Sequence, residues 1–154
     1  MEIIDLIHPK SIIANLRVTS KKQALQAMAR RAADLTGQSE RQIFEILLER
    51  ERLGTTGVGD GIAIPHGKLP HLNRLYGIFA RLNSAINFES IDERPVDLIF
   101  LLLAPEVAGV EHLQALARIS RLLRNKGTCD KLRDSDRVEV IYALLTEPRP
   151  SQAV

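Results

Sequence analysis

One histidine of this chain stands in a setting suited to covalent chemistry. His66 lies in the segment GVGDGIAIPHGKL, directly between a proline and a glycine. Pro65 fixes its own φ and lacks a backbone donor, while Gly67 permits a turn and leaves one side of the imidazole uncrowded. Neutral imidazole is a nucleophile at physiological pH, and a phosphoryl group on a ring nitrogen stays reactive enough to be passed on. The residues alone leave two interpretations open, a phosphoryl-accepting His66 and an ordinary structural histidine.

The glycines that precede His66 complete neither of two familiar nucleotide-binding motifs. A dinucleotide-binding G-x-G-x-x-G that starts at Gly57 would need its third glycine at position 62, where the chain has isoleucine. A Walker A loop needs serine or threonine after its lysine, and Lys68 is followed by leucine. We therefore expect no nucleotide and no other cofactor in the site.

The histidines and the single cysteine do not form a metal-binding pattern. His66 and His71 are five residues apart, no H-E-x-x-H is present, and Cys129 has no second thiol as a partner. His8 and His71 each adjoin a proline, and we expect both to be exposed residues without a role. Cys129 is expected to be a small, partly buried residue in a helix, and no metal is predicted.

Composition restricts the class of protein. The chain has 154 residues, 45% of them hydrophobic, which is enough for one globular domain with a sizeable core. The formal charge is +2 and the basic residues are scattered, so nucleic acid is not an expected partner. The start, MEIIDLIHPK, lacks the basic and apolar regions of a signal peptide, and no stretch is long enough to span a membrane. We expect a cytoplasmic protein without membrane insertion.

The elements that must position His66 alternate between strand and helix patterns. Strands are predicted over 11–18, 74–82 and 96–105, the first with Ile12, Ala14, Leu16 and Val18 on one side. The third, VDLIFLLLAP, is an apolar run apart from Asp97, which favours a central strand covered on both faces, although periodicity alone does not distinguish it from a buried helix.

Four helices are predicted between these strands and after them. Capping-box patterns at Ser20 and Ser39 begin the first two, which end near Gly37 and Gly54. Two more are predicted over about 109–125, with Gly127 as the C-terminal cap, and about 136–146. The pattern predicts a single-domain α/β sandwich over residues 1–154, with helices on both faces of a mixed sheet and a tail at 147–154.

The segment ERLGTTGVGDGIAIPHGKL resembles the active-site segment of phosphotransferase-system enzyme IIA domains of the fructose/mannitol type, and is most similar to their nitrogen-branch regulators. Glu51, the pair Val58-Gly59 and the run from Ile62 to Gly67 follow the family pattern. INFESIDERPVDLIFLLLAP and EHLQALARISRLLRN also resemble family segments, so the similarity covers about residues 5–146.

The resemblance implies roles for several residues. His66 would accept a phosphoryl group from the phosphohistidine of a small HPr-like carrier, and His112 would lie near it. Arg50, sixteen residues before His66, matches a family arginine, and Thr56 matches a Ser/Thr position near the phosphate. These roles fit their chemistry, since His112 could donate to a phosphoryl oxygen, Arg50 would be a cation, and Thr56 and the glycine backbone near Gly67 would supply further donors.

Asp60 is a less obvious member of the site. Its carboxylate would repel an incoming phosphoryl group unless it faced the other nitrogen of the imidazole or the carrier. We expect it to orient His66 or to contribute to docking.

The resemblance implies a regulatory phosphocarrier that accepts phosphate on His66 and acts on unknown partner proteins according to its phosphorylation state. A sugar-specific IIA that passes phosphate to a IIB domain is the first alternative. A binding module with an unmodified His66 is the second.

Overall fold

A computed structural model describes residues 1–147, and most of the predicted tail, 148–154, lies outside them. The elements within residues 1–147 are two 3₁₀ turns, six strands and five helices. The turns are η1 (Ile3–Asp5) and η2 (Pro9–Ser11), and the strands are β1 (Ile12–Leu16), β2 (Gly57–Gly59), β3 (Ile62–Ala63), β4 (His66–Leu69), β5 (Tyr76–Ile86) and β6 (Val96–Pro105). The helices are α1 (Lys21–Thr36), α2 (Glu40–Arg52), α3 (Val110–Leu123), α4 (Lys126–Arg133) and α5 (Val138–Thr146).

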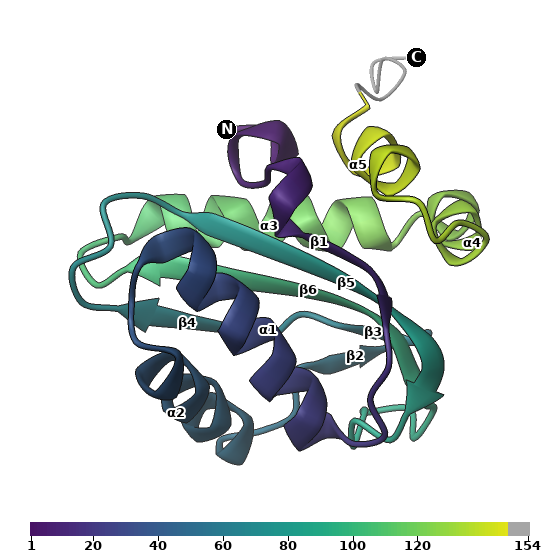
Figure 1. Cartoon of the computed structure of the whole chain (residues 1–154), viewed down its shortest axis with the longest axis horizontal. Helices are drawn as coiled ribbons and strands as arrows, with labels where there is room; N and C mark the ends of the chain where they lie inside the picture. The colour runs from purple at the N-terminus through teal and green to yellow at the C-terminus, as the bar shows by residue number, and fades with distance from the viewer. Residues whose placement is uncertain (148–154) are drawn as a thin grey trace.

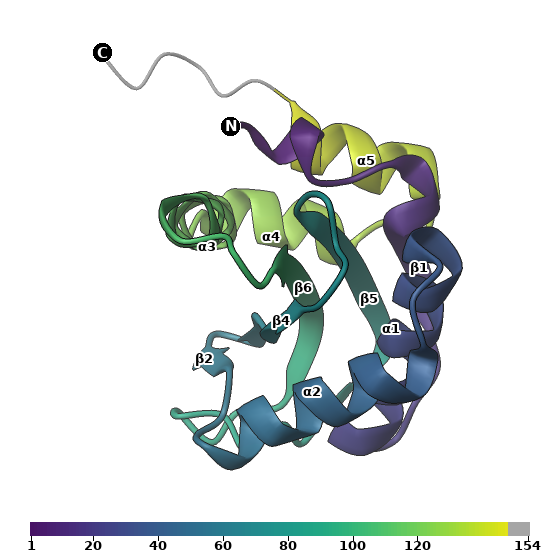
Figure 2. The same ribbon diagram turned by 90° about the vertical axis from the view of Figure 1, so that its left-hand side faces the viewer.

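The strands form one mixed sheet with helices on both sides, as predicted (Figure 1). The strand order is β1-β5-β6-β3-β2, and β4 also pairs with β6. β1 is parallel to β5, β5 is antiparallel to β6, and β3 and β4 are both parallel to β6. α1 and α2 cover one face, while α3, α4 and α5 cover the other (Figure 2).

Strand β6 has hydrophobic partners on both sides, which confirms the prediction from its unbroken apolar run. Leu98, Phe100 and Leu102 belong to the hydrophobic core beneath α3 and α5. Ile99 and Leu101 belong to the core beneath α1 and α2. Successive side chains point to opposite faces of a sheet, so a strand between two helical layers must be apolar at every position.

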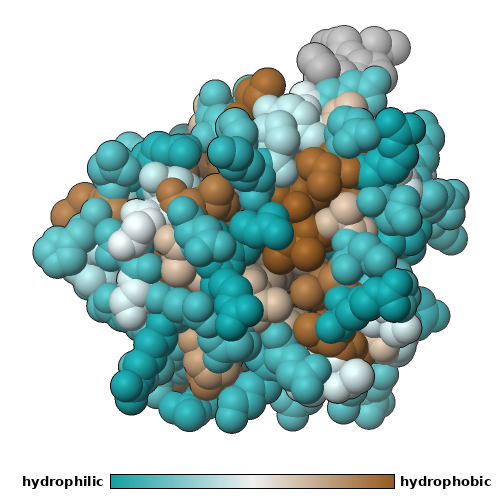
Figure 3. All heavy atoms as spheres, in the orientation of Figure 1, coloured by the Kyte–Doolittle hydropathy of each residue, from teal (hydrophilic) through white to brown (hydrophobic). Residues whose placement is uncertain are grey.

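The prediction that Ile12, Ala14, Leu16 and Val18 share one face of the first strand is wrong for its second half. Ile12 and Ala14 pack on the α3 and α5 side, but Leu16 and Val18 pack on the α1 and α2 side. The register with β5 shifts between Ile13 and Leu16, and such an irregularity reverses which face the later side chains meet. Figure 3 shows a mainly hydrophilic face with hydrophobic side chains gathered beside this edge strand.

The predicted starts of the first two helices are confirmed. The hydroxyl of Ser20 accepts from the backbone N–H of Gln23 at 3.1 Å, and that of Ser39 accepts from Gln42 N–H at 3.2 Å. Gly37 ends α1 with φ 74°, a left-handed conformation that glycine adopts without steric cost.

Helix α4 is absent from the four helices predicted from the sequence, which placed Gly127 as a C-terminal cap, although Cys129 was expected in a helical segment. The preceding helix ends earlier, at Leu123, and Asn125 caps α4 by accepting from Thr128 N–H at 2.9 Å. Gly127 therefore lies in the first turn of a new helix, which buries Cys129. Across residues 1–147, no helix combines the length and the apolar character needed to cross a lipid bilayer.

Candidate active site

His66 is the first residue of strand β4 rather than part of a turn, so the predicted Pro-His-Gly turn is wrong. It pairs with Leu102 in the parallel ladder with β6, and the carbonyl oxygen of Pro65 accepts from Leu102 N–H at 3.0 Å. The sheet therefore holds the backbone of His66, which explains how a half-buried imidazole is kept in one place.

The imidazole of His66 is fixed by its own chain. Nδ1 lies 2.9 Å from the carbonyl oxygen of Ile64. A carbonyl oxygen only accepts, so Nδ1 carries the proton and donates it in this hydrogen bond. In the neutral ring the lone pair then lies on Nε2, which is the nucleophilic atom.

The ring of His112, from helix α3, lies beside the ring of His66, as the resemblance implied. His112 is the third residue of α3, is 9% exposed, and its ring lies with its centroid 5.7 Å from that of His66, at an interplanar angle of 78°. Burial lowers the pKa of His112 below its ordinary value, and electrostatic interaction with the neighbouring His66 and Lys68 lowers it further. Nε2 of His112 is buried without a hydrogen-bond partner among the described residues.

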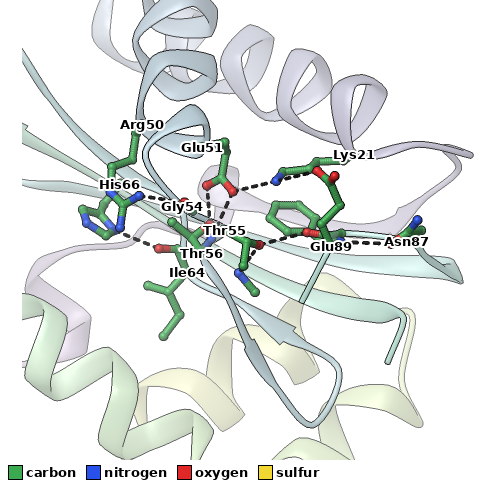
Figure 4. Close-up of polar contacts among 12 residues, drawn as sticks. Lys21, Arg50, Glu51, Gly54, Thr55, Thr56, Ile64, His66, Asn87 and Glu89 are labelled. Carbon is green, nitrogen blue, oxygen red and sulfur yellow. Dashed lines mark hydrogen bonds and ion pairs between the residues drawn. The ribbon is translucent and has the colours of Figure 1, made fainter. Parts of the chain in front are cut away.

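Arg50 lies in the last turn of α2, which packs against β4. Gly67 allows this close approach, because a Cβ there would lie 2.7 Å from Cγ2 of Ile46. Arg50 follows Ile46 by four residues and so shares its helix face. Its guanidinium donates to the carbonyl oxygen of Gly54 at 2.9 Å, and Figure 4 draws it in the region of His66.

Thr56 is buried, and both of its donors are already used. Its backbone N–H donates to Glu51 Oε1 at 3.0 Å, and its hydroxyl donates to Glu51 Oε2 (Figure 4). To bind a phosphoryl oxygen directly, Thr56 would have to give up one of these bonds.

Asp60 is not brought to His66. It lies in the turn between β2 and β3, and the next residue, Gly61, accepts from the backbone N–H of Leu98 at 3.1 Å. His66 pairs with Leu102, four residues further along β6, which is roughly 13 Å of extended strand. The carboxylate is 89% exposed and lies 3.9 Å from the guanidinium of Arg94. An orienting role toward the imidazole therefore has no geometric support, whereas docking stays a prediction.

Two charged residues near the site were not predicted to have a role. Glu51 is only 5% exposed and pairs with Lys21 at 2.9 Å (Figure 4). Glu51 stood in the segment that carries the family resemblance, but nothing in the sequence pointed to Lys21, thirty residues earlier.

The comparison with known families decides the class of protein. The model of the family described as "Phosphoenolpyruvate-dependent sugar phosphotransferase system, EIIA 2" matches residues 5–147. The chain belongs to this family. The family resemblance inferred from the segment around His66 is thereby confirmed.

Within the EIIA 2 family, the chain is similar to nitrogen regulatory proteins. It is 58% identical over 153 residues to the nitrogen regulatory protein of Bradyrhizobium diazoefficiens, covering 99% of this chain and 100% of that protein. It is 35% identical to the nitrogen regulatory protein of Escherichia coli K12, covering 96% and 91%.

Solved structures agree with the fold. The nitrogen regulatory protein IIA-Ntr of Neisseria meningitidis matches with a TM-score of 0.87 at 33% identity, covering 92% of this chain and 97% of that one. IIA mannitol of Escherichia coli matches with a TM-score of 0.76 at 20% identity, covering 90% and 98%, which supports the same fold.

Proposed function

We propose that this chain is a nitrogen-branch phosphocarrier that takes a phosphoryl group onto Nε2 of His66 from the phosphohistidine of an HPr-like carrier. The observation that carries the proposal is the hydrogen bond from His66 Nδ1 to Ile64, which leaves Nε2 with the free lone pair. The P–N bond of the carrier breaks, its imidazole leaves with the electron pair, and a P–N bond to Nε2 forms.

The surroundings of His66 suit this transfer. As Nε2 bonds to phosphorus, the ring becomes more positive, and the carbonyl oxygen of Ile64 that accepts from Nδ1 stabilises this charge. The nearby His112 would donate a hydrogen bond from its unpartnered Nε2 to a phosphoryl oxygen. Arg50 would supply a cation on the other side, from α2.

Similarity favours the nitrogen branch over the sugar branch. Relatives named as nitrogen regulatory proteins reach 58% identity, whereas the fructose-specific EIIA component of Haloferax volcanii is 32% identical. In the proposed role, the phosphorylation state of His66 controls the binding of regulated proteins in the cytoplasm. A sugar-specific role would instead require efficient onward transfer to a IIB domain.

Intact-protein mass spectrometry after incubation with the cognate phosphorylated carrier tests the proposal. We expect one added phosphoryl group that is stable to base and labile to acid, because a phosphoramidate differs from a phosphoester in this way. His66→Ala should remove it, and His71→Ala is a matched control because His71 is an exposed histidine outside the site. Full labelling of His66→Ala would refute the assignment, and persistent absence of label in the wild type would favour a binding module.

A further inference from the structure

A buried carboxylate lies behind the site, and the transfer step as described does not use it. Glu51 Oε1 accepts from both Lys21 Nζ at 2.9 Å and Thr56 N–H at 3.0 Å, and its other oxygen accepts from the Thr56 hydroxyl. Lys21 is also held from a second side, because its Nζ lies 4.8 Å from the ring centroid of Phe88. Glu51 thus joins the start of α1 to the end of α2 and to the chain that enters β2.

The hydrogen bonds continue from this carboxylate to the imidazole. The carbonyl oxygen of Thr56 accepts from Ile64 N–H at 3.0 Å, and the carbonyl oxygen of Ile64 accepts from His66 Nδ1 at 2.9 Å. Thr56 and Ile64 are each held at both their N–H and their carbonyl group, so the position of one residue constrains the next. Figure 4 shows Glu51, Thr56, Ile64 and His66 in this succession.

We propose that Glu51 is a positioning residue for His66, which holds the Ile64 carbonyl where it selects the Nδ1–H tautomer and aims Nε2 at the incoming phosphoryl group. The effect on transfer rests on the proposed function, whereas the effect on the tautomer does not. A carboxylate suits the role because it only accepts, and three donors converge on its two oxygens. Glutamine is isosteric but presents an NH₂ to one side, so at least one donor loses its acceptor.

The first experiment measures the tautomer of His66 by ¹⁵N NMR of the imidazole in the unphosphorylated protein. The wild type should show one tautomer, protonated at Nδ1. Glu51→Gln should show a mixture with Nε2–H, whereas Glu49→Gln should match the wild type, because Glu49 is an exposed glutamate two residues away that pairs with Arg52. A purely structural role would lower the melting temperature of Glu51→Gln and leave the tautomer unchanged.

The second experiment measures the rate of phosphoryl transfer from the carrier. Glu51→Gln should be slower by about tenfold, because a misplaced nucleophile loses part of its alignment. Glu49→Gln should retain the wild-type rate. Thr56→Val loses the hydroxyl that donates to Glu51, and its rate should lie between those of the wild type and Glu51→Gln. If Glu51→Gln does not fold, Thr56→Val and Lys21→Met replace it in both measurements.

Wild-type tautomer and wild-type rate in these variants would overturn the positioning role. If no variant and no wild-type protein is phosphorylated, the proposed function fails, but the NMR result still decides whether Glu51 controls His66.

Discussion

The rings of His66 and His112 meet edge to face, with their centroids 5.7 Å apart, although one begins a strand and the other lies in the first turn of a helix. The arrangement places the buried imidazole of His112, whose Nε2 has no hydrogen-bond partner among the described residues, beside the ring of His66, whose Nδ1 donates to the carbonyl oxygen of Ile64. In the proposed function, an anionic group added to His66 would lie beside the unpartnered Nε2 of His112.

Replacing His112 should slow transfer without adding or removing a phosphorylation site. His112→Ala removes a donor to a charged oxygen, a loss of about 1.5–3 kcal/mol or roughly ten- to a hundredfold in rate. Rapid-quench measurement of transfer from the phosphorylated carrier provides the value, with His8→Ala as the control because His8 caps the distant turn η2. Wild-type kinetics in His112→Ala would remove this residue from the proposed mechanism.

Stability should fall more steeply with acid in the wild type than in His112→Gln. The folded pKa of His112 is lowered by burial and by electrostatic interaction with His66 and Lys68, so the unfolded chain binds this proton more readily. The contribution is fully present above the unfolded pKa of about 6.5 and is lost as the pH falls from there through the folded pKa. Urea unfolding at pH 7.5, 6.5 and 5.5 measures it, and parallel curves for the two proteins would contradict the shift.

Arg50 should matter for transfer, while a neighbouring arginine should not. Arg50→Ala removes the cation expected to face the phosphoryl group, and the rate should fall by about tenfold or more. Arg52→Ala is the matched control, since Arg52 is exposed and pairs with Glu49 at 2.9 Å. Equal rates in both variants would show that Arg50 only stabilises the C-terminal end of α2, by donating to the carbonyl oxygen of Gly54.

Gly67→Ala should destabilise the protein by steric conflict with α2. The added Cβ would lie 2.7 Å from Ile46 Cγ2, and overpacking of this kind costs about 1–3 kcal/mol. Denaturant unfolding measures the loss, and Gly127→Ala in the exposed first turn of α4 serves as the control. Combining Gly67→Ala with Ile46→Ala removes the clash, so the double variant should lose less stability than the sum of the single variants.

Phosphorylation should change partner affinity without changing the fold. A phosphoryl group adds about −1.5 to −2 charges beside His66, which a partner packed there must pair with or be repelled by. We expect at least about a tenfold difference in affinity, or ~1.4 kcal/mol, between the two forms for a regulated protein. Partners are first recovered by pull-down with the wild type, with His66→Ala and with His66→Asp, an imperfect mimic of the phosphorylated charge. The affinity of each partner is then measured for the unphosphorylated and the phosphorylated protein. Equal binding of every partner except the carrier would favour simple phosphate relay.

The sequence by itself determined the elements whose signals are local. Ser20 and Ser39 cap their helices within one turn, Gly37 ends α1, and the long apolar run of β6 predicted a segment buried on both sides. These signals depend on residues a few positions apart, so the elements they specify can be predicted without knowledge of the fold.

Only the tertiary structure decided what His66 contacts. β4 is four residues long and contains glycine, and it becomes a strand because β6, more than thirty residues later, offers its backbone groups. The pairing of β3 with another part of β6 places Asp60 at a distance from His66, and helix packing brings Lys21 to Glu51. Hydrogen bonds between segments far apart in the chain produce no periodic pattern in the sequence. The tautomer of His66 and its connection to the Glu51 carboxylate could therefore be identified only from the folded structure.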